Sequence, residues 1–425
     1  YARAKALDAG FLRGLGLETI YLQGKPAVKM PYCDTEGQET AARFRINMTG
    51  KNRFIWRKGS KAQPYGLWKL DEARKAGYVY LVEGESDSQT LWSYGLPALG
   101  MPGASTFKPE WAAYLDGLTV YVWQEPDQGG ETLAAKVGAT LPDVRILRPP
   151  EGRKDVNEAH ILGDDVPALL ETLKAKARPW RELEAERLKA LAAEAQGEAR
   201  ELLSSPNILA EFDGLCQRLG LVGETANARL LYLALTSRLL DKPVSVAVKG
   251  PSSGGKSFTV ETVLKTMPES AYLDFTSMSE HALIYDERPV AHKFVVLYEA
   301  SGLGADRQGE PSVLAYSVRS LLSEGRIRYT TVEKTPDGMQ PRSIERQGPT
   351  GLITTTTWSS LHPENETRLL SLTVRDDPLQ TAAIFQALAD RYNGQGPGEP
   401  DLAPWLALQT WLELSGERRV TIPYA

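Results

Sequence analysis

The chain contains little of what zinc-binding, disulfide-bonded and membrane proteins require. Its two cysteines, Cys33 and Cys216, lie too far apart in the sequence to form a paired zinc-binding motif. The histidines are equally scattered: they are His160, His281, His292 and His362. No apolar run approaches the roughly 20 residues that span a bilayer, and no secretory signal is visible. We therefore expect a protein of a reducing, cytoplasmic compartment, without zinc and without a membrane partner.

The N-terminal part of the chain is basic although the whole chain is acidic. The formal net charge is −5, whereas residues 1–80 contain 15 Lys and Arg against 7 Asp and Glu. Cations that pair with phosphates and rings that stack on bases occur together on nucleic-acid-binding surfaces, and aromatic residues are interspersed with the basic ones here. The candidate nucleic-acid contacts are Arg43, Arg45, Lys51, Arg53 and Arg57. A solvated pair of basic strands with its rings in the core would have the same composition.

The length of 425 residues exceeds the size of one hydrophobic core, and the pattern predicts a multidomain α/β protein. Short alternating stretches predict a small β-rich module in residues 1–77. Strand-like and helix-like runs alternate in residues 78–178, which predicts a partly parallel sheet flanked by helices. Residues 179–240 have the composition of helices, and residues 241–392 begin with a buried-type strand. Residues 393–425 are expected to form a hinge and the start of a C-terminal element, because the segment opens with many Gly and Pro residues.

Acidic residues follow the predicted strands of the middle segment. Glu83 ends one strand and Asp87 lies in the first turn of the helix after it, while Glu125 and Asp127 follow another strand. A third acidic position, Asp155, follows the next strand. The carboxyl ends of neighbouring strands meet at the edge where α/β sheets carry their sites. Because clustered carboxylates repel one another unless a cation neutralises them, this arrangement predicts a site for Mg²⁺ or Mn²⁺.

The order of these motifs resembles the Toprim domain of bacterial and phage primases. The sequence EGESD begins at Glu83, a glycine loop follows at residues 100–105, and KDVNE occupies residues 154–158 after the acidic pair. The basic block at residues 44–54 resembles the small subdomain that precedes Toprim in the primase-helicases of tailed phages. The resemblance covers about residues 20–175.

This resemblance implies metal-dependent phosphoryl transfer, with Glu83 as general base or acid and Asp87 beside it in catalysis. The residues implied to hold the metal ion are Glu83, Glu125, Asp127 and Asp155. Asp87 is implied to share in holding the metal and the nucleotide phosphates. The family has an aspartate where this chain has Glu125, so we expect the metal position to differ. A Toprim scaffold that has lost catalysis is the alternative.

A second motif lies between a strand and a helix in the third segment. It fits GxxxxGK[ST], a loop whose backbone N–H groups wrap phosphates while Lys256 reaches the β- and γ-phosphates and Ser257 binds Mg²⁺. The predicted nucleotide-binding residues are Gly250, Pro251, Ser252, Ser253, Gly254, Gly255, Lys256, Ser257 and Thr356. Glu299 ends a second buried strand and is the candidate for polarising the attacking water, because Tyr298 replaces the usual acid before it.

The strand at residues 351–357 resembles the sensor strand of AAA+ ATPases, and Arg368 resembles the arginine finger that one subunit offers to its neighbour. A structural salt bridge would explain Arg368 equally. Residues 326–346 contain two strand-like runs around a Pro-Asp-Gly turn and predict a hairpin. In related helicases such a hairpin contacts DNA, which makes Arg326, Arg328, Lys334 and Arg342 candidate contacts. An ordinary exposed hairpin is the alternative.

Together these resemblances indicate a primase-helicase of phage, plasmid or integrative-element type. The implied cofactors are Mg²⁺ or Mn²⁺ and ATP, and the implied partners are a single-stranded DNA template, nucleotides, other replication proteins and further copies of the chain in a ring. Because the chain begins with Tyr1, we expect a piece of a longer protein that lacks the zinc module of such primases, and hence weak or sequence-indifferent priming. The alternatives are a Toprim nuclease coupled to an ATPase, and an ATP-switched loader or initiator with a vestigial Toprim domain.

Overall fold

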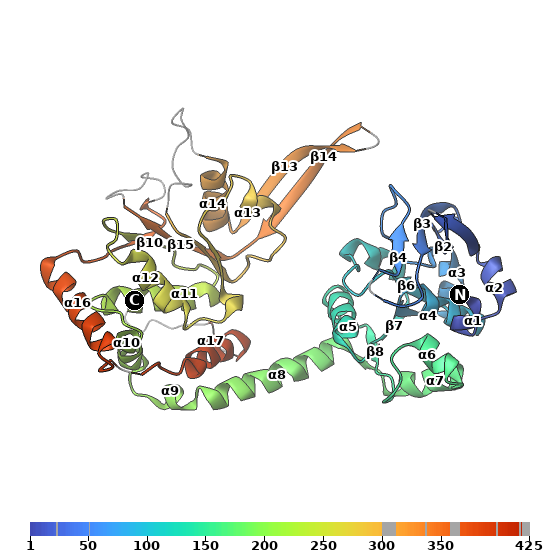
Figure 1. Cartoon of the computed structure of the whole chain (residues 1–425), viewed down its shortest axis with the longest axis horizontal. Coiled ribbons are helices and arrows are strands. Elements are labelled where there is room, and N and C mark those ends of the chain that lie inside the picture. Colours follow the sequence, from blue (N-terminus) through green and yellow to red (C-terminus); the bar gives the residue numbers. More distant parts are fainter. Residues whose placement is uncertain are drawn as a thin grey trace. The chain divides into compact units, whose positions relative to one another are not determined.

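The protein forms two compact units, Tyr1–Arg187 and Leu188–Ala425 (Figure 1). The computed structural model describes residues 1–22, 24–50, 52–299, 312–335, 338–357, 366–396, 398–415 and 418. Helix α8 (Trp180–Glu198) contains the boundary between the units. Among the described helices, none combines the length and the apolar character needed to cross a bilayer.

The first unit begins with two short helices and an antiparallel sheet. The helices are α1 (Ala2–Lys5) and α2 (Ala9–Gly14). The strands pair in the order β1 (Glu18–Leu22), β2 (Lys25–Cys33), β3 (Glu39–Arg45) and β4 (Phe54–Trp56). Met30 and Tyr32 of β2 and Ala42 of β3 are fully buried, so one part of the sheet belongs to the core. The predicted β-rich module is therefore present.

A second sheet of the first unit has the order β6-β5-β7-β8-β9. Its strands are β5 (Tyr78–Glu83), β6 (Ala98–Met101), β7 (Thr119–Trp123), β8 (Arg145–Leu147) and β9 (Arg178–Pro179). All neighbours are parallel except β8 and β9. Buried, mostly β-branched and aromatic residues in β5 and β7 explain why these runs form central strands.

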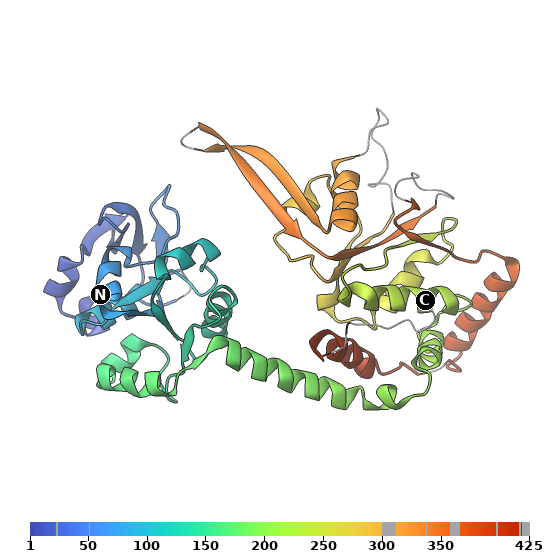
Figure 2. The ribbon, with the colours of Figure 1, turned by 180° about the vertical axis from the view of Figure 1, so that it is seen from behind.

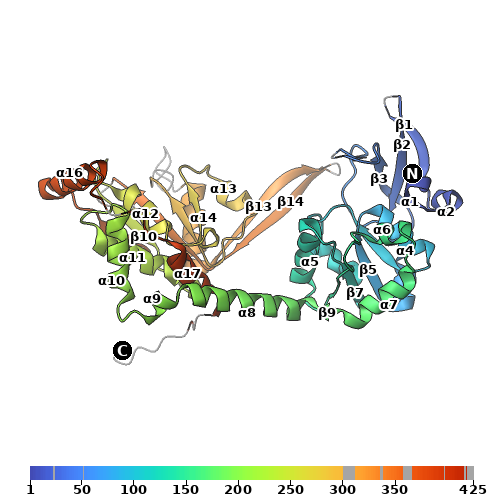
Figure 3. The ribbon, with the colours of Figure 1, turned by 60° about the horizontal axis from the view of Figure 1, so that its bottom comes forward.

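Helices cover both faces of this sheet (Figure 3). One face packs against η1 (Leu67–Lys69), α3 (Leu70–Ala76), η2 (Pro109–Leu115) and α5 (Gln128–Thr140). The other packs against α4 (Glu85–Ser93), α6 (Val156–Ile161) and α7 (Val166–Lys176). The predicted partly parallel sheet flanked by helices is confirmed, and with it the α/β fold class.

The second unit is built around a sheet of five parallel strands. Their order is β11 (Tyr272–Phe275), β12 (Lys293–Leu297), β15 (Thr350–Thr356), β10 (Val246–Lys249) and β16 (Leu370–Thr373). All seven residues of β15 are buried, as expected of a strand between two others. The predicted phosphate-binding loop follows β10, and the strand that leads to Glu299 is β12.

Helices surround this sheet and complete the core. They are α9 (Arg200–Ser204), α10 (Ile208–Arg218), α11 (Thr225–Thr236), η3 (Ser237–Leu239), α12 (Lys256–Leu264), η4 (Glu269–Ala271), α13 (Ala282–Tyr285), α14 (Val313–Glu324), α16 (Pro378–Tyr392) and α17 (Ala403–Ser415). Helix α17 buries Trp405 and Leu408 in the same core as α10 and α11. The predicted C-terminal element at residues 393–425 therefore differs from the structure, because α17 completes the core of the second unit. Residues 419–425 lie outside the described residues.

A long hairpin leaves the second unit. Strands β13 (Arg326–Thr335) and β14 (Gly338–Gln347) pair over ten positions, and the hairpin extends away from the parallel sheet (Figures 1 and 2). Ile327 and Tyr329 pack at its base, whereas Val332 and Met339 are exposed toward its far end. The predicted hairpin is present, and its Pro-Asp turn lies outside the described residues.

Candidate active sites

The acidic residues of the first unit gather at the carboxyl ends of β5 and β7. Glu83 ends β5, and Gly84, whose φ of 85° suits glycine, turns the chain into α4 with Asp87 in its first turn. Glu125 and Asp127 follow β7, and Asp155 caps the N-terminus of α6. Because β5 and β7 are parallel neighbours, their ends bring these side chains together.

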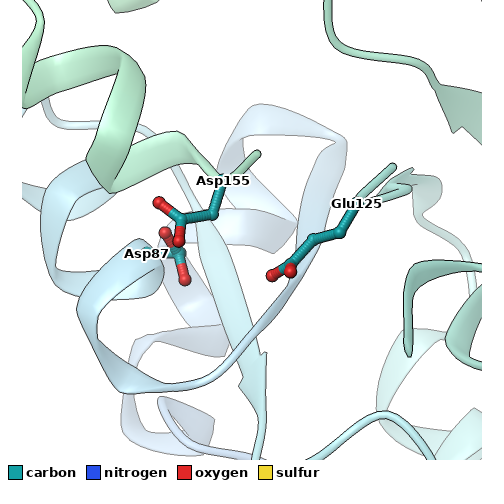
Figure 4. A group of neighbouring side chains, drawn as sticks. All are labelled: Asp87, Glu125 and Asp155. Atoms are coloured by element: carbon teal, nitrogen blue, oxygen red, sulfur yellow. The ribbon is translucent and has the colours of Figure 1, made fainter. Parts of the chain in front are cut away.

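Three of these carboxylates point toward one another (Figure 4). One oxygen from each of Asp87, Glu125 and Asp155 lies within 4.8 Å of the other two. Asp87 is 3% exposed and Glu125 is 6% exposed. Asp87 accepts a hydrogen bond of 2.9 Å from the backbone N–H of Asn157. The structure thus groups Asp87, which was assigned first to catalysis, with two of the predicted metal ligands.

The other two predicted ligands lie beside this cluster. A side chain added at Gly129 would meet an oxygen of Asp127 and an oxygen of Glu83, each 3.0 Å from its Cβ, so the two carboxylates are close neighbours. Glu83 Oε1 is buried and has no hydrogen-bond partner among the described residues. An unpartnered buried oxygen next to three converging carboxylates fits a divalent cation with hard oxygen ligands.

The electrostatics of the cluster depend on burial and mutual repulsion. Burial, followed by the charge of Asp155, raises the pKa of Asp87 well above its ordinary value. Burial and the nearby Glu83 raise the pKa of Glu125 to about 7. Burial and then Asp127 also raise the pKa of Glu83. Ionising all these carboxylates at once therefore costs free energy unless a cation lies beside them.

Lys154 supplies a positive charge at the edge of the cluster. Its amine lies 2.9 Å from Asp127 Oδ2 and 3.3 Å from Glu125 Oε2. The hydrogen bond from Lys154 is the main reason that the pKa of Asp127 lies below its ordinary value. Our assignment of site residues missed Lys154. The only sequence signal for it is its place immediately before Asp155 in the KDVNE motif.

Basic side chains line a cavity of about 350 Å³ together with the acidic ones. The basic residues that line it are Lys5, Arg43, Arg45, Arg53 and Lys154. Lys5 was not predicted, because no motif surrounds it. The structure brings it here through α1, where its carbonyl accepts a hydrogen bond of 2.9 Å from the Asn157 side chain. Lys51 lies outside the described residues.

Several predicted nucleic-acid contacts have partners within the protein. Arg43 pairs with the buried Glu85 at 3.0 Å, and Tyr32 donates a hydrogen bond of 2.6 Å to the same oxygen. Arg57 pairs with Glu39 at 2.5 Å. The alternative of a structural basic strand pair therefore describes Arg43 and Arg57 better, because their guanidinium groups already neutralise carboxylates. Arg53 has no ion pair among the described residues and remains a candidate contact.

The phosphate-binding loop of the second unit has the predicted strand–loop–helix context. Gly250 follows β10, and Gly255, with φ of 78°, caps the N-terminus of α12. Lys256 is buried and donates hydrogen bonds to the carbonyls of Gly250 (3.0 Å) and Pro251 (2.5 Å), so its amine lies across the loop. Ser257 is exposed at the helix start. This geometry leaves the N-terminus of α12 open for phosphate.

The predicted partners of the loop lie on the adjacent strands. Thr356 ends β15 directly beside Lys249 of β10, and its carbonyl accepts a hydrogen bond of 3.2 Å from the Gly250 N–H. Glu299 follows β12 with φ of 66°, and its N–H donates to Thr355 Oγ1 at 2.9 Å. Lys249 and Glu366 form an ion pair that we did not predict.

Arg368 and the hairpin arginines have neighbours of their own. Arg368 Nε donates a hydrogen bond of 2.7 Å to Ser323 Oγ. On the hairpin, Arg328 pairs with Glu345 at 3.3 Å and Arg342 pairs with Glu333 at 2.9 Å. The side chains of Arg326 and Lys334 are exposed on the hairpin.

Two sequence comparisons show which proteins the chain is similar to. The family model described as the MTBMA_p00010 P-loop domain matches residues 194–333, which confirms the predicted P-loop domain. The gene 57 protein of Mycobacterium phage D29 is 33% identical over 134 residues, which are 31% of this chain and 86% of the phage protein. The chain belongs to the family of this phage protein. The predicted relationship to proteins of phages or other mobile elements is therefore confirmed.

Solved structures of primases show a more distant likeness. The RNA polymerase domain of the Mycobacterium tuberculosis primase DnaG is 15% identical, with a TM-score of 0.37 over 44% of this chain and 78% of that one. The Aquifex aeolicus primase is 17% identical, with a TM-score of 0.38 over 50% of this chain and 64% of that one. The primase fragment of the bacteriophage T7 primase-helicase is 18% identical, with a TM-score of 0.33 over 40% of this chain and 72% of that one.

Proposed function

We propose that this member of the phage gene 57 family is a primase-helicase: its first unit is a Toprim primase core, and its second is an AAA+-like ATPase that moves or unwinds DNA. The observation that carries the first half is the cavity of the first unit. It is lined by converging carboxylates, among them Asp87, Glu125 and Asp155, and also by cations, among them Lys5, Arg45 and Arg53. Primer synthesis needs both kinds of charge, because a nucleotide brings a negatively charged triphosphate to an acidic site.

In this proposal the basic side chains of the cavity bind the triphosphate of the incoming nucleotide and orient its α-phosphate. Glu83 Oε1, which is buried and has no protein partner in the described part of the chain, accepts the proton of the attacking 3′ hydroxyl. The 3′ oxygen bonds to the α-phosphorus as the bond from that phosphorus to the leaving pyrophosphate breaks. Burial favours this role, because it raises the pKa of Glu83 above its ordinary value. A divalent cation held by Asp87, Glu125 and Asp155 would stabilise the charge that develops on the phosphate.

Primer synthesis is tested with single-stranded template, labelled nucleotides and Mg²⁺ or Mn²⁺. We expect Glu83→Gln to reduce the rate of extension by roughly 10²- to 10⁴-fold, and Asp87→Asn to abolish it. Glu131→Gln, which changes an exposed carboxylate of α5 outside the cavity, is the matched control. Equal activity in all three variants would remove the assignment. Template cleavage with Mn²⁺ in place of extension would establish the nuclease alternative.

The sheet order of the second unit supports the ATPase half. Strand β15, proposed as the sensor strand, lies between the P-loop strand β10 and the strand β12 that leads to Glu299. A nucleotide on Lys256 and Ser257 would therefore have Thr356 and Glu299 on its γ-phosphate side. In this proposal Glu299 polarises the attacking water and the exposed hairpin, with Arg326 and Lys334, contacts DNA.

The helicase proposal requires a ring, and Arg368 offers a test of it. In a ring, Arg368 of one subunit would act on the nucleotide bound at Lys256 of its neighbour. Mixing inactive Arg368→Ala with inactive Lys256→Ala should then restore part of the ATPase rate, because some subunit interfaces contain both an intact Lys256 and an intact Arg368. Ser323→Ala removes one hydrogen-bond partner of Arg368 and keeps the charge of the arginine, so this variant should stay active. No recovery on mixing, with a monomer in sedimentation and an ATPase indifferent to DNA, would contradict the helicase. ATP-dependent DNA binding without extension or unwinding would indicate a loader.

A further inference from the structure

A cavity of about 380 Å³ opens directly beside the phosphate-binding loop of the second unit. Its floor includes Ser253, Gly254 and Gly255 of the loop and Phe258 of the first turn of α12. Helix α16 and the turn at residues 220–224, which connects α10 to α11, contribute further lining residues. This volume lies in the range of small-ligand sites. None of these wall residues belongs to the phosphate site described above, except those of the loop itself.

The side chains at the centre of this cavity are apolar. Phe258, Ile384 and Leu388 line it and are 44%, 40% and 44% exposed, and Leu221 adds a buried surface. Phe258 follows Lys256 by two residues, so the loop that would hold phosphates fixes its position. Large apolar side chains left half-exposed beside a phosphate site fit a flat, weakly polar group attached to a phosphate chain.

Each buried polar side chain of the cavity has at least one hydrogen bond within the protein. Gln380 donates to the Val222 carbonyl at 2.5 Å. Glu224 accepts from the Arg375 N–H at 2.7 Å and from Asn227 at 2.6 Å. Thr259 donates to the Gly255 carbonyl at 3.0 Å. The charged groups of Asp376 and Arg391 have no hydrogen bond to another described residue, but both side chains are exposed to water.

We propose that this cavity holds the base of the nucleoside triphosphate bound at Lys256, and that it holds purines and pyrimidines with similar affinity. The proposal rests on nucleotide binding by the P-loop in the proposed function. Strong discrimination between bases requires buried polar groups that a wrong base leaves unpaired. Here Gln380, Glu224 and Thr259 already bond to other protein groups. Stacking on Phe258 and contact with the apolar side chains of α16 therefore provide the affinity. The exposed Arg391 can stack on any base.

The test measures dissociation constants of the full chain for ATP, GTP, CTP and UTP with Mg²⁺, and for inorganic tripolyphosphate. We expect the four nucleotides to bind within roughly tenfold of one another. Phe258→Ala should weaken all four by roughly 3- to 10-fold, the usual contribution of one aromatic contact, and leave tripolyphosphate unchanged. Phe385→Ala is the matched control, because Phe385 is 67% exposed on α16 and does not line the cavity.

Two results would overturn the proposal. A preference of 100-fold or more for one base would mean that the site reads base edges. Equal nucleotide affinity in Phe258→Ala and wild type would place the base elsewhere. Lys256→Ala distinguishes failure of the base site from failure of nucleotide binding by the P-loop. If wild type and Lys256→Ala bind nucleotides equally poorly, the P-loop does not bind nucleotide and the base site fails with it. If binding depends on Lys256 but strongly favours one base, only the proposed base site is refuted.

Discussion

The amine of Lys154 lies 2.9 Å from a carboxylate oxygen of Asp127, and 3.3 Å from one of Glu125. A cation of the protein itself thus bridges two residues to which the Toprim resemblance assigns a metal ion. Because the Lys154 side chain is 54% exposed, it can move into solvent when another cation arrives. In the proposed site, a metal ion would therefore compete with Lys154 for the same oxygens.

Lys154→Met should increase the affinity of the chain for Mn²⁺ in the absence of nucleotide. The substitution keeps most of the side-chain volume and removes the charge that competes for Asp127 and Glu125. Titration calorimetry, or the loss of the free Mn²⁺ resonance signal, measures the effect. Lys75→Met, on the exposed end of α3, should leave the affinity unchanged. A lower affinity in Lys154→Met would show that Lys154 helps to organise the site.

The stability of the metal-free protein should fall as the pH rises through about 7. Glu125 has a raised pKa of about 7 in the folded state, against an ordinary value of 4.5. Between these values the folded state binds more protons than the unfolded state, so stability decreases with pH and stays lower above 7. The raised pKa of Asp87 acts in the same direction. Thermal unfolding from pH 5 to 8 without metal measures this decline.

Glu125→Gln should flatten that decline, since glutamine does not titrate. Added Mn²⁺ should bind more tightly as the pH rises, because its ligands must be deprotonated. A pH profile of unfolding that is the same in wild type and Glu125→Gln would contradict the raised pKa.

Glu85→Gln should destabilise the first unit by roughly 3–5 kcal/mol, the usual effect of leaving a buried charge without its partner. Glu85 is 2% exposed and neutralises Arg43, whose side chain is 14% exposed. Denaturant unfolding of the full chain measures the loss. The double variant Arg43→Met with Glu85→Gln removes both charges and should recover part of it. If Arg43→Met alone weakens DNA binding without loss of stability, the structural account of Arg43 is wrong.

Gly138→Ala should destabilise the first unit by roughly 1–3 kcal/mol through overpacking. A Cβ at Gly138 in α5 would overlap the indole ring of Trp180. Gly197→Ala is the matched control: it is also helical, but its Cβ would meet no atom within 4 Å. That change should stabilise helix α8 by roughly 0.5–1 kcal/mol. Equal melting temperatures of the two variants would argue against the Gly138–Trp180 packing.

Much of the fold is predictable because its signals are local. Buried runs such as Tyr78–Glu83 and Lys293–Leu297 have the length and β-branched content of strands, and both form central parts of parallel sheets. The loop from Gly250 to Ser257 carries its own requirements for glycine, lysine and a helix start, so its conformation follows from neighbours in sequence. The hairpin of β13 and β14 could be predicted for the same reason, because its two strand-like runs flank one turn in the sequence.

Which residues lie together in the two sites depends on contacts between segments that are far apart in the sequence. The contact between Arg43 and Glu85 joins residues 42 positions apart, and the contact of Asn157 with Lys5 joins residues 152 positions apart. No periodicity of the sequence encodes such pairs, so Lys5 and Lys154 were missed and Arg43 was assigned to nucleic acid. The sequence determines which strands end in carboxylates and which loop accepts phosphate. Only packing of distant segments decides which charges meet there, because the free energy of a charge depends on its burial and on the charges around it.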